Sequence, residues 1–273
     1  MTVHLTAPSA SPPPTTRPPV PWWAALLAVL GVLTVLGAVA AVTGVLLVQA
    51  GTREVTEAVD QTGVRTLRIE GVTGGVTLAT EGAAAGTVTG QAEVTTSFQQ
   101  AELQTVRRGD ELVLRATCPD SGWARRCDVV YDLLVDADVD VVVDIVTGGM
   151  RATGLAGDVD VSVTAGGVLL EETVAQDVRV DVTTGGIALS FAEPPREVEV
   201  TATTGGVDIG VPDDGTAYDV RTSVSVGDAG VSVTDDDTAE RRISVSTTVG
   251  GISVHTGEQQ GWDPEAGPGP ARP

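Results

Sequence analysis

From residue 64 onward, apolar and polar residues alternate along most of the chain, and valine is the usual apolar residue. Residues 158–163 read Asp-Val-Asp-Val-Ser-Val, and residues 177–182 read Asp-Val-Arg-Val-Asp-Val. A period of two places neighbouring side chains on opposite faces of a β-strand, so each segment has one apolar and one polar face. A short second apolar segment follows each of them, as at residues 187–189. The pattern predicts two short strands per unit and no helix after residue 62.

A pair of adjacent glycines separates the two predicted strands of each unit. Four such pairs begin 18, 19 and 20 residues apart between residues 148 and 206, and a degenerate copy lies at residues 227–231. A fixed period near 20 residues is typical of repeat architectures, in which stacked units bury a continuous core. Glycine also adopts the positive-φ conformations that a tight corner requires. We therefore expect structural turns at Gly74, Gly75, Gly148, Gly149, Gly166, Gly167, Gly185, Gly186, Gly205, Gly206, Gly250 and Gly251.

The part of the chain before these regular units also has strand patterns. Alternation predicts strands at residues 64–69, 72–78 and 86–97. Residues 111–116 and 129–135 are two further apolar segments on either side of a short loop, and we expect them to form a hairpin.

An uncharged apolar run covers residues 22–48. Its 27 residues exceed the ~20 that cross the hydrocarbon core of a bilayer. Trp22 and Trp23 begin the run, and aromatic residues are enriched at the membrane interface. The run therefore predicts one transmembrane helix over residues 22–49. A cleaved signal peptide is the alternative, because residues 38–40 read Ala-Val-Ala.

Both interpretations place the alternating part of the chain outside the cytoplasm. With Arg17 and no acidic residue, the N-terminal tail agrees with a single-pass protein of the cell membrane whose C-terminal domain is extracytoplasmic. We expect a disordered, Pro-rich cytoplasmic tail at residues 1–21, a polar stalk at 50–62, a β-repeat domain at 63–256 and a disordered C-terminal tail at 257–273.

Cys118 and Cys127 are the only cysteines of the chain, and they bracket a turn-rich loop of eight residues. Two cysteines around a loop of an exported domain indicate a disulfide bond. A metal-binding pair is the alternative, although no other cysteine exists and His255 is far away in the sequence.

The order of these motifs resembles a known family. The motifs are Val-Arg-Thr-Leu-Arg-Ile-Glu at residues 64–70, Val-Asp-Ala-Asp at 135–138, Gly-Leu-x-Gly-Asp-Val at 154–159, and the serial Thr-x-Gly-Gly elements. Together they resemble the bacterial "putative adhesin" β-repeat domain over about residues 64–256. That family is a domain of unknown function that is often carried on membrane-anchored proteins. The resemblance implies a stacked-strand domain at the cell envelope, and it implies no catalytic residues.

Charge and composition exclude several classes of protein. The net charge is −21, and every basic residue is an arginine. So acidic a chain lacks the basic footprint that nucleic-acid binding requires. Aromatic residues make up only 3% of the chain, so the core must consist of small aliphatic residues.

Few residues suggest chemistry. The histidines are His4 and His255 only, and the Gly-x-Ser-x-Gly and His-Glu-x-x-His motifs are absent. Acidic pairs such as Asp158 and Asp160 satisfy the distance that glycoside hydrolysis needs, but aromatic sugar platforms are nearly absent. Calcium is the one weak cofactor candidate, since Ca²⁺ binds clustered carboxylates. Its candidate ligands are Asp213, Asp214, Asp235, Asp236 and Asp237.

The sequence thus predicts an all-β, β-solenoid-like ectodomain preceded by one transmembrane α-helix. We expect a non-enzymatic, membrane-anchored protein that serves adhesion or interaction with envelope components through repeated Asp, Thr and Ser side chains. Its partners would be the membrane, through residues 22–48, and an unknown envelope protein or glycan, with no nucleic acid. An accessory subunit of an envelope-stress sensing system and a carbohydrate-active β-helix enzyme are the alternatives.

Overall fold

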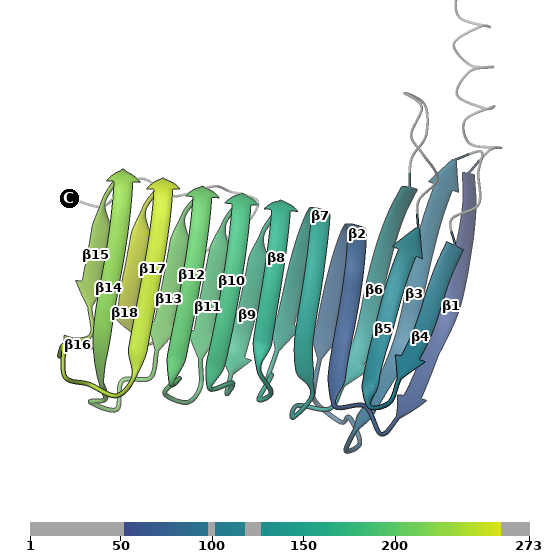
Figure 1. The fold of residues 1–273 in the computed structure, drawn as a ribbon, viewed down its shortest axis with the longest axis horizontal. Coiled ribbons are helices and arrows are strands. Elements are labelled where there is room, and N and C mark those ends of the chain that lie inside the picture. Colours follow the sequence, from purple (N-terminus) through teal and green to yellow (C-terminus); the bar gives the residue numbers. More distant parts are fainter. Residues whose placement is uncertain (1–51, 98–101, 118–126, 258–273) are drawn as a thin grey trace, which may run out of the picture. The chain divides into compact units, whose positions relative to one another are not determined.

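The computed structural model describes residues 52–97, 102–117 and 127–257, which form β-strands joined by turns (Figure 1). These residues belong to one compact unit that begins at Thr52. The expectation of an all-β fold of stacked strands is confirmed, and the described residues contain no helix. The strands are β1 (Thr52–Thr62), β2 (Thr66–Ala79), β3 (Thr87–Ser97), β4 (Glu102–Arg108), β5 (Glu111–Thr117), β6 (Cys127–Val135), β7 (Asp140–Thr153), β8 (Val159–Ala165), β9 (Val168–Thr173), β10 (Asp177–Thr184), β11 (Ile187–Phe191), β12 (Glu197–Thr204), β13 (Val207–Val211), β14 (Ala217–Val226), β15 (Ala229–Ser232), β16 (Thr234–Asp235), β17 (Arg242–Val249) and β18 (Ile252–Thr256).

Most strands lie in two rows of parallel strands that share one hydrophobic core (Figure 1). Each regular unit contributes its first strand to the front row and its second strand to the back row, and we call such a pair of strands a rung. The long strands β2 and β7 take part in both rows. The front row runs β5, β2, β7, β8, β10, β12, β17, β14, and the back row runs β6, β2, β7, β9, β11, β13, β18, β15.

Equivalent residues of successive rungs lie beside one another. In the front row, Val178 pairs with Val159 on one side and with Val198 on the other. In the back row, Ile187 pairs with Val168. These five side chains are buried in the core between the rows. Because side chains alternate along a strand, the intervening Asp, Ser, Thr and Arg residues point outward.

The order of the rungs differs from the order of the sequence at both ends of the stack. The last strands of the sequence, β17 and β18, lie between the β12–β13 rung and the β14–β15 rung. Near the other end, β2 lies between the β5–β6 rung and β7. The first and last rungs of the sequence are therefore each held by strand pairing on two sides.

The predicted hairpin of residues 111–116 and 129–135 is wrong. Strands β5 and β6 lie in different rows, and both pair with β2 in parallel. Their antiparallel partners are β4 for β5 and β3 for β6. The two strands are the arms of one rung, and residues 118–126 between them lie outside the described residues. Neighbourhood in the sequence therefore did not imply pairing.

The predicted stalk is also wrong over most of its length. Residues 52–62 form β1, which pairs with β3 along its entire length in antiparallel register. Between Val55 and Thr62, Val59 is the one buried residue of β1, so the strand carries almost no apolar alternation. Backbone pairing with β3, rather than burial of side chains, holds it in place.

Three expected segments fall outside the described residues: the N-terminal tail at 1–21, the transmembrane segment at 22–49 and the tail beyond Gly257. Among the residues that are described, no helix has the length and apolar character needed to cross a membrane.

Candidate functional site on the front face

The corner between the two strands of a rung depends on its first glycine. Gly185 and Gly205 both have φ of +148°, a conformation that L-residues with side chains rarely adopt. A Cβ atom on Gly205 would lie 1.6 Å from the carbonyl oxygen of Gly185, so the corners stack without room for a side chain. On Gly206, the second glycine of that pair, a Cβ atom would come no closer than 4.0 Å to the Gly251 carbonyl oxygen. The close stacking of the first glycines keeps the rungs in register.

This register aligns outward side chains into columns that run across the front row. Ser162 pairs with Asp181, Asp181 with Thr201, and Thr201 with Ser246, and the column ends at Ser223 of β14. A second column lies two residues further along each strand, near the corners. We call these two sets the hydroxyl columns, and their exposed hydroxyl residues are Ser162, Thr164, Thr183, Thr201, Thr203, Ser223, Ser225, Ser246 and Thr248.

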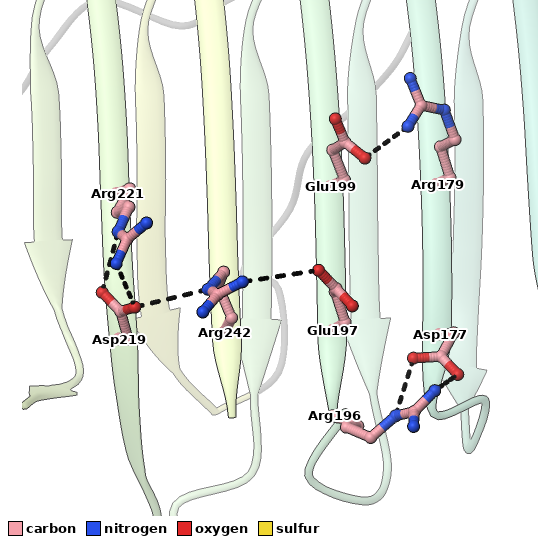
Figure 2. A network of polar contacts seen from close by, with 8 residues as sticks. All are labelled: Asp177, Arg179, Arg196, Glu197, Glu199, Asp219, Arg221 and Arg242. Atoms are coloured by element: carbon pink, nitrogen blue, oxygen red, sulfur yellow. Dashed lines mark hydrogen bonds and ion pairs between the residues drawn. The ribbon is translucent and has the colours of Figure 1, made fainter. Parts of the chain in front are cut away.

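Nearer the starts of the same strands, ion pairs replace the hydroxyl groups, and Figure 2 shows them. Arg196 donates hydrogen bonds to both carboxylate oxygens of Asp177, with Nε 3.0 Å from Oδ1. Arg179 donates to Glu199 of the next strand. Both pairs join neighbouring rungs, so they add links across the stack at the surface.

A longer chain of contacts centres on Asp219, whose side chain is only 8% exposed. Arg221 donates from Nη2 to Oδ2 of Asp219 at 2.8 Å and from Nε to Oδ1 at 3.2 Å. Arg242 of β17 lies 3.4 Å from the same Oδ2, and its Nη1 lies 3.9 Å from Oε1 of Glu197 (Figure 2). A nearly buried carboxylate needs such partners, because an unpaired charge would lose its hydration without compensation.

An open groove of about 440 Å³ runs along the starts of β7, β8, β10 and β12. Its acidic wall includes Asp140, Asp158 and Asp177, and Arg196 is a basic residue on it. Partial burial, followed by the nearby charges of Asp177 and Asp140, raises the pKa of Asp158. The front face, defined as the outer surface of these strands with β17 and β14, thus combines an acidic groove, ion pairs and hydroxyl columns.

Residues 140–255 match the Toastrack DUF4097 family. The expected resemblance is therefore confirmed, over a shorter range than the residues 64–256 that the motifs suggested. We call residues 140–255 the Toastrack segment, and the front face from β7 to β14 lies almost wholly within it.

Solved structures also match the chain, at low sequence identity. A protein from Clostridium sporogenes described as a "putative cell adhesion protein" is 11% identical, with a TM-score of 0.46 over 76% of this chain and 100% of its own. A "putative adhesin" from Bacteroides fragilis is 11% identical, with a TM-score of 0.30 over 74% and 97% of the two chains. Similarity at this level says nothing about function. No curated protein matches the chain.

Two of the aspartates that the sequence offered for calcium accept hydrogen bonds within turns of the Toastrack segment. Asp214 accepts a hydrogen bond from the Thr216 backbone at 2.9 Å, and Asp236 accepts one from the Thr238 backbone at 2.9 Å. The Oδ1 atom of Asp235 accepts from the Val220 backbone at 3.1 Å. The other two candidates, Asp213 and Asp237, are exposed. Within the described ranges, no group of three or more acidic, His or Cys side chains is arranged to hold a metal ion.

His255 lies on the back row, away from the front face. Its Nε2 is 3.2 Å from Oδ1 of Asp208. Ser232 is its neighbour in the β15–β18 ladder, and the Ser232 hydroxyl donates to the Val254 carbonyl oxygen at 3.4 Å. Cys127 carries no free thiol, whereas Cys118 lies outside the described residues, so the pairing of the two remains a prediction.

The sequence pattern did not predict the ion pairs around Asp219 and Arg242. These residues are 23 positions apart, and they meet because β17 lies beside β14 in the front row. One signal was present in the sequence: Arg179 stands at a polar position of its repeat, two residues before Asp181 and in register with Glu199. An alignment of the repeats would place Arg179 beside Glu199, but the contacts of Arg242 also require the order of the rungs.

Proposed function

We propose that this is a non-enzymatic, membrane-anchored protein of the cell envelope whose front face binds an extended envelope component. The observation that carries the proposal is the pair of hydroxyl columns. Neighbouring strands of a sheet lie about 4.8 Å apart, so each column repeats a hydroxyl or carboxylate group at that interval. Many weak, evenly spaced contacts suit a partner that is itself repetitive, such as a glycan, because each further contact forms at a high effective concentration.

The rigidity of the face supports this proposal. Outward side chains on paired strands need little ordering when they bind, so less conformational entropy is lost. The Arg179–Glu199 pair and the chain of contacts at Asp219 link neighbouring rungs on the same face. Such a surface offers fixed positions for hydrogen bonds, and the proposal involves no metal or cofactor.

The location of the protein is part of the same proposal. The uncharged run at residues 22–48 would anchor the chain in the cell membrane as a single span. The β-stack would then lie outside the cytoplasm, where Cys118 and Cys127 form a disulfide bond. The partner would be a glycan or a protein of the same envelope.

The experiment measures how much of the detergent-solubilised full-length protein sediments with purified, insoluble cell walls. The test variant replaces Thr164, Thr183, Thr201 and Thr203 with valine, which keeps the β-branched shape and removes the hydroxyl groups. We expect its apparent affinity to fall at least tenfold, because four repeated contacts are lost together.

The matched control replaces Thr56 and Thr105 with valine. These threonines are also exposed, but they lie on β1 and β4, away from the front face. The control should bind like the unmodified protein. Equal binding of the test variant would overturn the proposed front-face site, and hydrolysis of a wall glycan by the purified protein would overturn the non-enzymatic part.

A further inference from the structure

Within the described residues, strands β14 and β15 form the edge at one end of the stack, and most of their outer side has no partner strand. On its outer side, β14 pairs with β16 only at Ala217 and Tyr218, and no described strand continues this pairing. The side chain of Asp235 accepts from the backbone N–H of Val220, which satisfies one further group. Hydrogen-bonding groups alternate along a strand, so the N–H and C=O groups of Thr222 and Val224 face away from β17.

The composition of this edge is unusual for an exposed strand. Residues 220–226 read Val-Arg-Thr-Ser-Val-Ser-Val, and the single charge at Arg221 is paired with Asp219. Val226 is 62% exposed, and Val231 of β15 is 41% exposed. Natural proteins usually protect such edges with Lys, Pro, a bulge or a covering segment. An unprotected, neutral edge of Val, Ser and Thr is suited to pairing with another strand.

The core also ends abruptly at this edge. Val220, Thr222 and Val224 are in register with the buried residues Ile243, Val245 and Thr247 of β17. They therefore face the core side of the front row, yet Thr222 is exposed and the two valines are only half-buried. One more strand beside β14 would cover them and continue the core by one rung.

We propose that the occupant of this edge is a second copy of the same chain, with β14 pairing antiparallel to its counterpart around a two-fold axis at Thr222. In this register Thr222 lies opposite Thr222 of the second copy, and Val220 lies opposite Val224. The two threonines exchange backbone hydrogen bonds, and the carbonyl oxygen of Val224 of the second copy replaces Asp235 as the acceptor of the Val220 N–H. The pairing ends there, because β16 occupies the outer side of Tyr218. The same axis brings the two β15 edges towards each other, because it is perpendicular to both rows.

Charge favours contact between two copies at this edge over contact at any other part of their surfaces. The chain has a net charge of −21, so two copies repel each other over most of their surfaces. Along this edge, however, Arg221 lies opposite the neutral Ser223 of the second copy, and no like charges face each other. The edge is therefore self-complementary, as an isologous interface must be. The two front faces would then join into one longer surface.

The test is oxidative cross-linking of the full-length protein in intact cells, read as disulfide-linked dimer on a non-reducing gel. The variant Thr222→Cys places each new cysteine opposite the same cysteine of the second copy. The Cα atoms of such an antiparallel pair are separated by a distance that a disulfide bond can also span. The matched control is Val106→Cys, an exposed position on the edge strand β4 at the far end of the stack. We expect most of the Thr222→Cys protein to form dimer, and the control to show only the background of the unmodified protein.

A second pair of variants tests the register without disturbing the core. Ser223→Arg places a second arginine opposite Arg221, and it should raise the dimer dissociation constant about tenfold. Ser223→Asp places an acid opposite Arg221 and should lower the constant. Ser223 is exposed, so neither change threatens folding.

Three results would overturn this proposal. The first is a cross-linking yield of Thr222→Cys no greater than that of Val106→Cys. The second is dimer that forms only after residues 258–273 are deleted, since that segment would then be the occupant. The third is a cross-linked product that contains a different protein. None of these results bears on the front-face proposal, whose binding assay is separate.

Discussion

At one end of the stack, the antiparallel strands β3, β1 and β4 lie outside the rung of β5 and β6. At the other end, the two-residue strand β16 is the only described strand outside the rung of β14 and β15. The covered end carries charges on its edge strands, such as Glu57 on β1 and Arg107 on β4. Arg107 also donates to the carbonyl oxygens of Thr62 and Gly63 at 2.6 Å, which links β4 to the end of β1. Exposed valines occur at both ends, at Val55 and Val106 and at Val226 and Val231, but residues 220–226 of the open edge carry a single charge, at Arg221. One end of this stack of similar rungs is therefore closed by antiparallel strands that carry charged side chains. The other end leaves the backbone groups of an edge strand available for pairing.

The two ends also differ in the corner of their rungs and in their charged contacts. Between β5 and β6 the sequence has no glycine pair, whereas the corner between β14 and β15 contains Gly227, with φ of +134°. A nearly buried carboxylate, Asp219, organises the open end, whereas the covered end has the more exposed pair of Glu70 and Arg115. Each end nevertheless contains one buried tyrosine, Tyr131 or Tyr218. These similarities and differences can be tested separately.

The largest effect is expected at a glycine corner near the open end. In Gly250→Ala, the new Cβ would lie 1.8 Å from the carbonyl oxygen of Gly205, at a φ of +151°. Relief of this clash requires a shift of the backbone, so we expect the free energy of unfolding to fall by about 3 kcal/mol or more. In the control Gly251→Ala, the nearest atom is 3.8 Å away, and the loss should stay within about 1 kcal/mol. Chemical denaturation measures both, and equal losses would show that the corners do not depend on the first glycine.

The next largest effect is expected at the carboxylate of the open end. Asp219→Asn removes the charge that Arg221 and Arg242 share, which leaves two arginines without their common partner. We expect a loss of about 1–3 kcal/mol, because hydrogen bonds to charged, poorly exposed groups are among the stronger ones. The control Asp213→Asn changes an exposed acid and should have almost no effect. The thermal midpoints of the two variants measure this difference. Equal shifts for Asp219→Asn and Asp213→Asn would show that the contacts of Asp219 with Arg221 and Arg242 do not stabilise the fold.

A smaller effect, of opposite sign, is expected at the two buried tyrosines. The hydroxyl oxygens of Tyr131 and Tyr218 have no hydrogen-bond partner among the described residues. Replacing either tyrosine by phenylalanine should leave stability unchanged or raise it by about 1 kcal/mol, because an unsatisfied buried polar group is removed. A clear loss of stability at only one end would show that the hydroxyl there has a partner such as a bound water.

The same tyrosines predict sensitivity to alkaline pH. Burial, with a nearby acid at each site, raises the pKa of both Tyr131 and Tyr218 to about 12. The unfolded chain therefore loses these protons at a lower pH, near 10, than the folded protein does. The contribution of the protonated tyrosines to the free energy of unfolding is complete below about pH 10, and it is lost as the pH rises towards 12. The double phenylalanine variant should lose less stability over this range than the unmodified protein, as denaturation at several pH values would show.

The smallest effect is expected at the exposed pair of the covered end. A hydrogen bond from Arg115, with further help from its charge, lowers the pKa of Glu70. Glu70→Gln should cost about 0.5 kcal/mol at neutral pH, since solvent screens such a pair. The pair stabilises the fold above the pKa that Glu70 has in the unfolded chain. This stabilisation disappears as the pH falls through the lower pKa that Glu70 has in the folded protein. A loss as large as that of Asp219→Asn would contradict the contrast between the two ends.

Much of the repeat could be predicted from the sequence. The strands of the Toastrack segment follow the alternation of valine with polar residues, and the corners follow the glycine pairs. The polar positions Ser162 and Thr201 also followed from alternation, which is a local property of each strand. The errors lie before residue 140, where β1 has little alternation and the rung of β5 and β6 has no glycine pair at its corner.

The order of the rungs and the ion pairs of the front face could not be derived in this way. Every rung has a similar face of valine side chains. The rung of β17 and β18 could therefore pack either outside the rung of β14 and β15 or between that rung and the rung of β12 and β13. The structure places β17 between β12 and β14, which brings Arg242 to Asp219 and Glu197. Only the tertiary pairing creates this cluster.

The sequence by itself thus determined the strands, their period, the glycine corners and which side chains face outward, because these depend on residues close together in the chain. The tertiary structure decided which rungs are neighbours, which strands form the two ends and which charges meet. Parallel pairing joins residues that are distant in sequence, and nearly equivalent apolar faces do not specify the partner. The open edge at β14 is therefore a property of the folded stack alone.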